Sequence, residues 1–114
     1  MLRDQQRALH AYECVATVNG KRTEYQIAVN SLGANILRSG LCAAIASVQR
    51  LDNPGGLLGH LAKAGVPGLD GANADDLAER VCQLDADGYM LATRELLQVA
   101  TWLKRAAQAT FKGD

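Results

Sequence analysis

The sequence predicts an all-α protein, a single compact bundle of about six helices joined by short loops. Helix formers dominate the composition, because the 114 residues include 19 alanines and 16 leucines but only three tyrosines, one tryptophan and one phenylalanine. Apolar residues recur at helical spacing along most of the chain, most regularly near its C-terminus. The length fits one domain, residues 1–114, whose core needs neither a disulfide nor a metal.

Composition and patterning exclude several classes of protein. Hydrophobic residues make up 48% and charged residues 21% of the chain, which is typical of a globular domain and not of a disordered one. No window approaches the roughly 20 apolar residues of a membrane span, and the polar start at residues 1–7 lacks the apolar region of a secretory signal. We therefore expect a cytoplasmic protein without membrane contact. Cys14, Cys42 and Cys82 form no Cys-x-x-Cys pair, which favours reduced, partly buried thiols.

The charges sum to zero but are unevenly distributed. Residues 1–63 carry seven basic and four acidic side chains, residues 64–87 carry one and six, and residues 88–114 carry four and two. A neutral total argues against a domain that binds nucleic acid strongly on its own. It is compatible with a local basic face.

Two helices are expected in the first 30 residues. The first runs from Arg3 to Val18 and ends at Asn19-Gly20. The second, residues 21–30, also alternates like a strand; we favour a helix because a lone strand would lack a partner. The predicted buried face of the first helix consists of Gln5, Ala8, Leu9, Tyr12, Val15 and Ala16.

A long central helix is predicted next. Ser31 is a suitable N-cap, and the helix would reach Leu51 with Gly40 inside it, at a cost of roughly 1 kcal/mol relative to alanine. The Pro- and Gly-containing turn after it leads into a two-turn helix, residues 57–64, and then into the longest loop, residues 65–71. The expected apolar band of the central helix consists of Gly33, Ile36, Leu37, Leu41, Ala44, Ile45 and Val48.

Two further helices complete the expected bundle. Asn73 would cap a helix whose first turns are acidic, the placement that the helix dipole favours. Residues 85–88 separate it from the last helix, Tyr89 to Lys112. The predicted buried face of this last helix consists of Tyr89, Ala92, Leu96, Val99, Leu103, Ala106, Ala107 and Thr110.

The residues show no catalytic or metal-binding arrangement. His10 and His60 lie far apart in sequence and neither belongs to a metal-spaced pair. Residues 85–88 lack the flanking carboxylates of a calcium loop, and residues 55–59 lack the Lys and Ser/Thr of a phosphate loop. We therefore expect no catalytic residue, no metal and no cofactor, and a binding or assembly module in place of an enzyme.

Basic side chains follow the outer face of the last helix. Arg94, Arg105 and Lys112 share helical spacing, with Lys104 on their flank, and Arg3 and Arg7 form a weaker stripe on the first helix. Two positive stripes suit a phosphate backbone. A solvated face that complements the helix dipole is the alternative interpretation.

Three apolar side chains of the last helix are candidates for a partner surface. Met90 and Leu97 are expected to point outward and Trp102 to lie at the border of the buried stripe. Interfaces favour Met and aromatic anchors, although another helix of the bundle would cover these residues equally well. A stand-alone helical adaptor or dimerisation module is therefore an alternative function, whereas the acidic helix after Asn73 disfavours a DNA-binding regulator.

Three segments resemble a known family, the small subunit of the type III-B CRISPR effector, or Cmr complex. The most specific is Tyr89-Met90-Leu91-Ala92-Thr93-Arg94-Glu95-Leu96-Leu97 with the later Trp102-Leu103-Lys104-Arg105-Ala106-Ala107, similar to the family's last helix. The others are residues 11–15 and 37–41, and residues 52–87 are unmatched.

The resemblance implies an all-helical, cytoplasmic subunit that is not itself a nuclease. Such small subunits lie beside the backbone subunits of the ribonucleoprotein and line the channel that holds the target RNA paired to the guide RNA. On this basis Lys104 and Arg105 are expected to contact target phosphates, with Arg94, Lys112, Arg3 and Arg7 as helpers. The chain is expected to be monomeric in isolation, and its acidic segment, residues 70–87, to face water or a neighbouring subunit.

Overall fold

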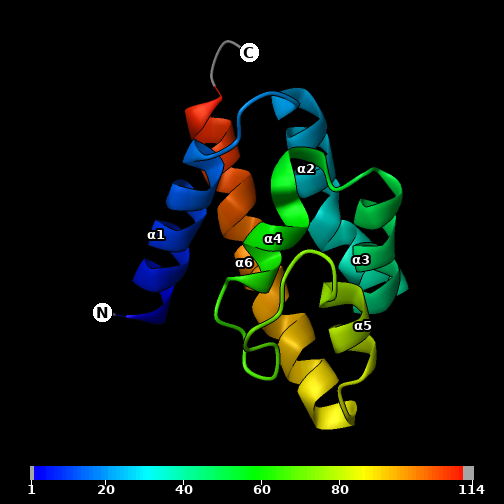
Figure 1. Cartoon of the computed structure of the whole chain (residues 1–114). Helices are drawn as coiled ribbons and strands as arrows, with labels where there is room; N and C mark the ends of the chain where they lie inside the picture. The colour runs from blue at the N-terminus through cyan, green and yellow to red at the C-terminus, as the bar shows by residue number, and fades with distance from the viewer. Residues whose placement is uncertain (1, 112–114) are drawn as a thin grey trace.

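The computed structural model describes residues 2–111 and consists of helices packed around one long C-terminal helix (Figure 1). No strand occurs within these residues, which confirms the predicted all-α bundle of six helices. The elements are α1 (Arg3–Ala16), α2 (Arg22–Ser39), α3 (Leu41–Arg50), the 3-10 turn η1 (Pro54–Gly56), α4 (Leu57–Ala62), α5 (Leu77–Cys82) and α6 (Ala86–Thr110).

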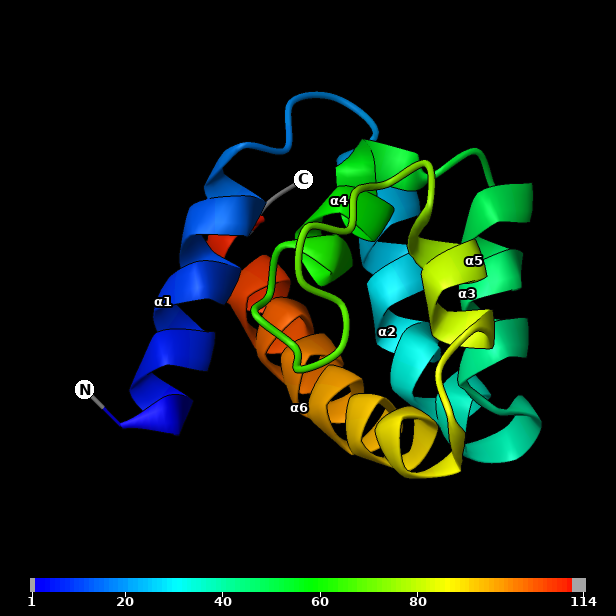
Figure 2. The same cartoon turned by 60° about the horizontal axis from the view of Figure 1, so that its bottom comes forward.

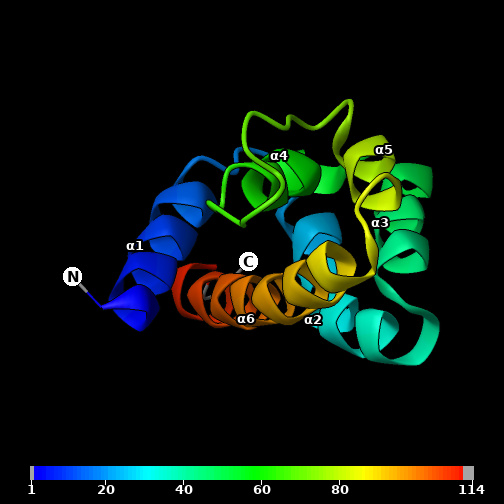
Figure 3. The same cartoon turned by 90° about the horizontal axis from the view of Figure 1, so that it is seen from below.

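Helix α6 organises the bundle. Seen from below, α6 crosses the molecule between α1 on one side and α2 on the other (Figure 3), and it packs against both. Asp85 caps its start by accepting a hydrogen bond from the Gly88 backbone N–H at 2.7 Å, so α6 begins three residues earlier than predicted. Its buried residues are Ala92, Glu95, Leu96, Val99, Ala100, Leu103, Ala106 and Ala107.

The boundary between the second and third helices differs from the prediction. Helix α2 runs through Ser31, whose hydroxyl donates to the Ile27 carbonyl oxygen within the same helix instead of capping a new one. The chain breaks at Gly40, whose φ of 90° and ψ of 162° no helix accommodates. The predicted helix from Ser31 to Leu51 is therefore wrong, because the break at Gly40 rotates α3 away and leaves Leu37 exposed.

Helix α1 buries a face that shares only Val15 with the predicted one. Its buried residues are Arg7, Ala11 and Val15, whereas Leu9 and Tyr12 are about half exposed. The prediction placed every charged residue on the exposed side of the helix, whereas Arg7 belongs to the buried face. Placing Arg7 outside shifted the predicted buried face around the helix.

The segment between α3 and α6 contains short elements and turns. Gly55, with a φ of 63°, lies so close to Tyr25 that a β-carbon there would approach the ring to 2.7 Å. Asn73 does cap a turn, since its side-chain oxygen accepts from the backbone N–H groups of Asp75 and Asp76, but regular helix α5 starts only at Leu77. Within the described chain, no helix combines the length and hydropathy that a bilayer crossing requires.

Candidate nucleic-acid interface and partner surface

The exposed side of α6 carries the predicted cations. Arg94, Lys104 and Arg105 are all exposed, and none forms an ion pair with another residue of the segment 2–111. Arg94 and Arg105 are eleven residues apart, which is three helical turns, so they project from the same side about 16 Å apart along the axis. This basic face lies opposite the buried stripe, as predicted.

Trp102 positions one of these cations. The guanidinium carbon of Arg105 lies 5.1 Å from the centre of the Trp102 ring, a cation–π contact. The indole is itself half-buried and packs against the core. A long side chain that would otherwise sample many rotamers is thus held against a fixed aromatic surface, with its N–H groups available to an anion.

The three predicted partner-surface residues differ in exposure. Met90 is 70% exposed in the first turns of α6, as expected. Leu97 is half-buried and packs against the core, so the prediction that it points fully outward is wrong. Trp102 lies at the border of the buried stripe, as predicted. Because Met90 and Leu97 lie seven residues apart on the same flank, they form an apolar edge beside the basic face.

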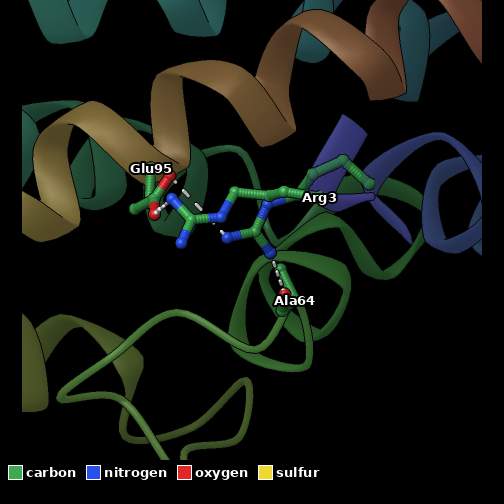
Figure 4. A network of polar contacts seen from close by, with 4 residues as sticks. Arg3, Ala64 and Glu95 are labelled. Atoms are coloured by element: carbon green, nitrogen blue, oxygen red, sulfur yellow. Dashed lines mark hydrogen bonds and ion pairs between the residues drawn. The ribbon is translucent and has the colours of Figure 1, made fainter. Parts of the chain in front are cut away.

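The predicted basic stripe on α1 is wrong, because Arg7 is buried and Arg3 is ion-paired. Arg3 donates to Glu95 Oε1 at 2.8 Å, and Arg7 lies 3.8 Å from Glu95 Oε2 (Figure 4). Arg7 also donates to the carbonyl oxygen of Ala64 in the loop after α4. The network ties α1 to α6 and to this loop.

Burial sets the energetic weight of this network. Glu95 is only 1% exposed, and its charge would be costly in the core without a cation beside it. Arg7 is 8% exposed and supplies that cation, whereas the Arg3 side chain is 65% exposed. The Arg7–Glu95 contact is a buried ion pair without a hydrogen bond, and Arg3 supplies the hydrogen bond to Glu95 from the solvent side. Lys112, the remaining predicted cation, lies outside the described residues.

Sequence reasoning missed a further cation near the C-terminal end of α6. The guanidinium carbon of Arg22, at the start of α2, lies 5.4 Å from the centre of the Phe111 ring. Phe111 directly follows α6 and is buried. The adjacent pair Lys21-Arg22 was the available signal in the sequence, but only the packing of α2 against α6 brings Arg22 to this end of the basic helix.

Both histidines belong to a polar cluster where α1, α2 and α4 meet. His10 donates from Nε2 to the carbonyl oxygen of His60 at 2.9 Å, and the Tyr25 hydroxyl lies 2.9 Å from His60 Nδ1. Cys14 Sγ is 3.7 Å from His10 Nδ1. Hydrogen bonds of His60 therefore join α4 to α1 and to α2, both of which are distant from it in sequence.

Burial shifts the titration of this cluster. It lowers the pKa of His60 to about 4, with the neighbouring His10 and Lys63 acting in the same direction. It also raises the pKa of the Cys14 thiol to about 11 and that of the Tyr25 hydroxyl above its ordinary value. The ring, thiol and phenol are thus all neutral near pH 7.

The hollow beside this cluster is open and lacks a metal-binding set. It measures about 460 Å³ and is lined by His10, Glu13, Cys14, His60 and Lys63 together with Thr17, Gly56 and Gly59. Across residues 2–111, no group of three or more His, Cys, Asp or Glu side chains is arranged to hold a metal ion. The hydrogen bonds of His60 with His10 and Tyr25 make this region a junction between α1, α2 and α4.

Comparisons with known proteins agree with this fold. Residues 3–110 match the family described as CRISPR-associated protein (Cas_Cmr5). The fold is similar to the crystal structure of a CRISPR-associated Cmr5 family protein from Thermus thermophilus, with a TM-score of 0.80 and 33% sequence identity over 96% of this chain and 97% of that one. No curated protein matches the sequence.

The family match spans nearly the whole described chain, and the structural match extends over both proteins almost completely. The family match therefore includes residues 52–87, for which the sequence analysis found no resemblance. The chain belongs to the Cmr5 family and is a small subunit of the type III-B CRISPR Cmr complex, which associates with the other subunits of that complex.

Proposed function

We propose that this subunit is non-catalytic, works in the cytoplasm, and helps to build the Cmr filament while holding the target RNA that is paired to the guide RNA. The observation that carries the proposal is the basic face of α6. Arg94 and Arg105 project from one exposed side with Lys104 on their flank, and no acidic side chain of residues 2–111 neutralises them.

Such a face suits a phosphate backbone. Lysine and arginine contacts to phosphates position a strand without reading its sequence. In an RNA-guided complex base pairing with the guide supplies the sequence specificity, so a subunit that holds the duplex needs only charge and shape. Arg105, held by Trp102, offers the best-ordered donor of the three.

The neutral total charge fits a subunit that acts inside an assembly. With 12 basic and 12 acidic residues, the isolated chain has no strong overall attraction for RNA. Once docked beside the backbone subunits, each weak phosphate contact gains from the high effective concentration of the bound duplex. We therefore propose weak RNA binding by the chain alone and a measurable contribution in the complex.

The apolar edge next to the basic face is proposed to contact a neighbouring subunit. Met90 is its most exposed residue and Leu97 presents its uncovered part beside it, whereas Trp102 lies on the other flank of the basic face. Because cations and apolar side chains share one helix, a subunit docked there would lie next to the RNA. Helix α6 would then connect the filament to its target.

The double substitution K104A/R105A in the reconstituted, guide-loaded complex tests the RNA contact. We expect weaker target binding for every target sequence. The slope of log affinity against log salt concentration should fall in magnitude by about 0.7 for each lost single-strand contact. The matched control is R38A/R50A, which removes the same charge from exposed positions on α2 and α3. Equal affinities and salt slopes for both variants would contradict the proposal.

A further inference from the structure

Two cysteines from separate helices meet at one end of the molecule. Cys42 lies in the first turn of α3 and Cys82 is the last residue of α5, and their sulfur atoms are 3.2 Å apart. Cys42 is half-buried, whereas Cys82 is exposed, so the sequence-based expectation of partial burial is wrong for Cys82. Both thiols are free, and at least one is open to solvent.

The backbone around this pair is fixed by several contacts. Helix α3 starts directly after the break at Gly40, and the Cys42 backbone N–H donates to the Tyr89 hydroxyl of α6 at 3.0 Å. Helix α5 packs along α3 (Figure 2), and the Asp85 cap of α6 follows Cys82 by three residues. The starts of α3 and α6 and the end of α5 therefore hold the two sulfurs near each other.

We propose that Cys42 and Cys82 are a redox-active dithiol that closes to a disulfide when the protein meets a small disulfide oxidant, such as oxidised glutathione. The exposed Cys82 thiolate attacks the oxidant and forms a mixed disulfide, releasing one glutathione thiolate. The Cys42 thiolate then attacks Cys82 Sγ and expels the second glutathione thiolate. The protein loses two electrons and two protons, and the oxidant is reduced to two thiols.

Closure would bind α5 covalently to α3. The bridge spans 40 residues of sequence, a segment that contains η1, α4 and the acidic turns before α5. Cross-linking a loop of this length restricts the unfolded chain, so the oxidised protein is expected to melt at a temperature higher by on the order of 10 °C. The rigidified end of the bundle carries Met90, the exposed residue of the apolar edge.

Cys14 provides an internal reference. It lies on α1 in the polar cluster, away from the other two sulfurs in the fold, and it is half-buried. Burial raises the pKa of its thiol to about 11, and the hydrogen bond with Cys42 raises the pKa of Cys82 as well, so what sets Cys14 apart is that no second thiol lies beside it as Cys42 lies beside Cys82. Replacing Cys14 should leave the proposed chemistry unchanged.

The test treats the full chain with oxidised glutathione and compares the wild type with C14S, C42S and C82S. Wild type and C14S should each yield one non-reduced peptide pair that joins the segments of Cys42 and Cys82, with the mass lowered by two hydrogen atoms. Both proteins should also show the higher melting temperature, and dithiothreitol should reverse it. C82S replaces an exposed side chain, so it should fold normally and show neither effect.

Two results would overturn the proposal. One is a wild-type protein whose Cys42 and Cys82 stay reduced, or carry only glutathione, at oxidant concentrations that fully oxidise an unfolded control. The other is a bridge formed mainly between two molecules, seen as a dimer on a non-reducing gel that C82S abolishes.

Discussion

Arg7 of α1 and Glu95 of α6 face each other in the protein interior, with 3.8 Å between the guanidinium and the carboxylate. The two side chains border a hollow of about 250 Å³ that is also lined by Gln6, Ala64, Gly65 and Pro67. Replacing Glu95 leaves the Arg7 charge buried without its counter-charge, whereas Glu95 would keep Arg3 as a partner if Arg7 were replaced. The pair therefore fixes how α1 lies on α6.

Removing the carboxylate should destabilise the fold strongly. For E95A we expect a loss of about 3–5 kcal/mol in the free energy of unfolding, because Arg7 stays buried without its counter-charge. R3A should cost less, about 1–2 kcal/mol, because it removes one hydrogen bond to the buried carboxylate but leaves Arg7 as counter-charge, and the Arg3 side chain itself is 65% exposed. Urea titrations of both variants give these values. Similar losses for the two would mean that burial is not what gives Glu95 its importance.

The break at Gly40 should tolerate no side chain. G40A places a β-carbon at a φ of 90° and 3.5 Å from the Tyr89 hydroxyl, so we expect a loss of about 1–3 kcal/mol. The control is G33A, in helical backbone with nothing within 4 Å of the added carbon, which should gain roughly 0.5–1 kcal/mol. Thermal unfolding compares the two. If G40A were as stable as G33A, Gly40 would not be required to end α2.

Acid should weaken the fold through His60. Its pKa falls from the ordinary 6.5 to about 4 in the folded protein, because burial disfavours the charged ring. Between these values the unfolded chain binds a proton that the folded chain does not, so stability is complete above pH 6.5 and declines toward pH 4. Allowing for solvent at this half-buried ring, the loss is on the order of 1–2 kcal/mol.

The variant H60Q isolates this contribution. Its urea midpoints, measured from about pH 7.5 to about pH 4.5, should fall less steeply than those of the wild type, while other groups titrate equally in both proteins. Parallel pH profiles would show that His60 does not carry the dependence.

Trp102 should influence RNA binding through Arg105. In the reconstituted complex, W102F keeps an aromatic face under the guanidinium and should bind the target nearly as the wild type does. W102L keeps an apolar side chain without that face, and should lose a few-fold in affinity, equivalent to roughly 0.5–1 kcal/mol. No further loss is expected when W102L is added to R105A, because Trp102 acts on RNA only through Arg105. If W102L lowered the affinity by the same factor with and without R105A, Trp102 would not act through Arg105.

Assembly gives a prediction that is independent of RNA. Light scattering behind a sizing column should find the isolated chain at its monomer mass of 12.1 kDa. Mixed with guide-loaded backbone subunits, it should co-elute in more than one copy. A stable oligomer of the chain alone that ignores the backbone subunits would favour the adaptor alternative instead.

The sequence was most informative where one pattern dominates. Helix α6 has an apolar stripe that only the buried Glu95 interrupts, with Leu96, Val99 and Leu103 at its centre, so both its existence and the exposed positions of Arg94 and Arg105 could be predicted. The resemblance to the family's last helix pointed to the same element. Periodicity and family signature coincide there.

The misplaced features depend on contacts between distant residues. Arg7 belongs to the core only because Glu95 meets it from far along the chain, and no local pattern contains that pair. Gly40 was predicted to lie within a helix. Its positive φ depends on how α3 packs on α5 and α6, and the local sequence does not contain those contacts. Arg22 reaches the end of α6 only through the packing of α2.

The central claim, that the basic face of α6 holds the target RNA, is tested most directly by ultraviolet cross-linking of a guide-loaded Cmr complex to its target. Mass spectrometry of the digested complex should find nucleotides attached to peptides of this subunit that contain residues 94–105. K104A/R105A should reduce that yield, and R38A/R50A should leave it unchanged. Cross-links confined to the other subunits, or to α2 and α3 of this one, would contradict the account.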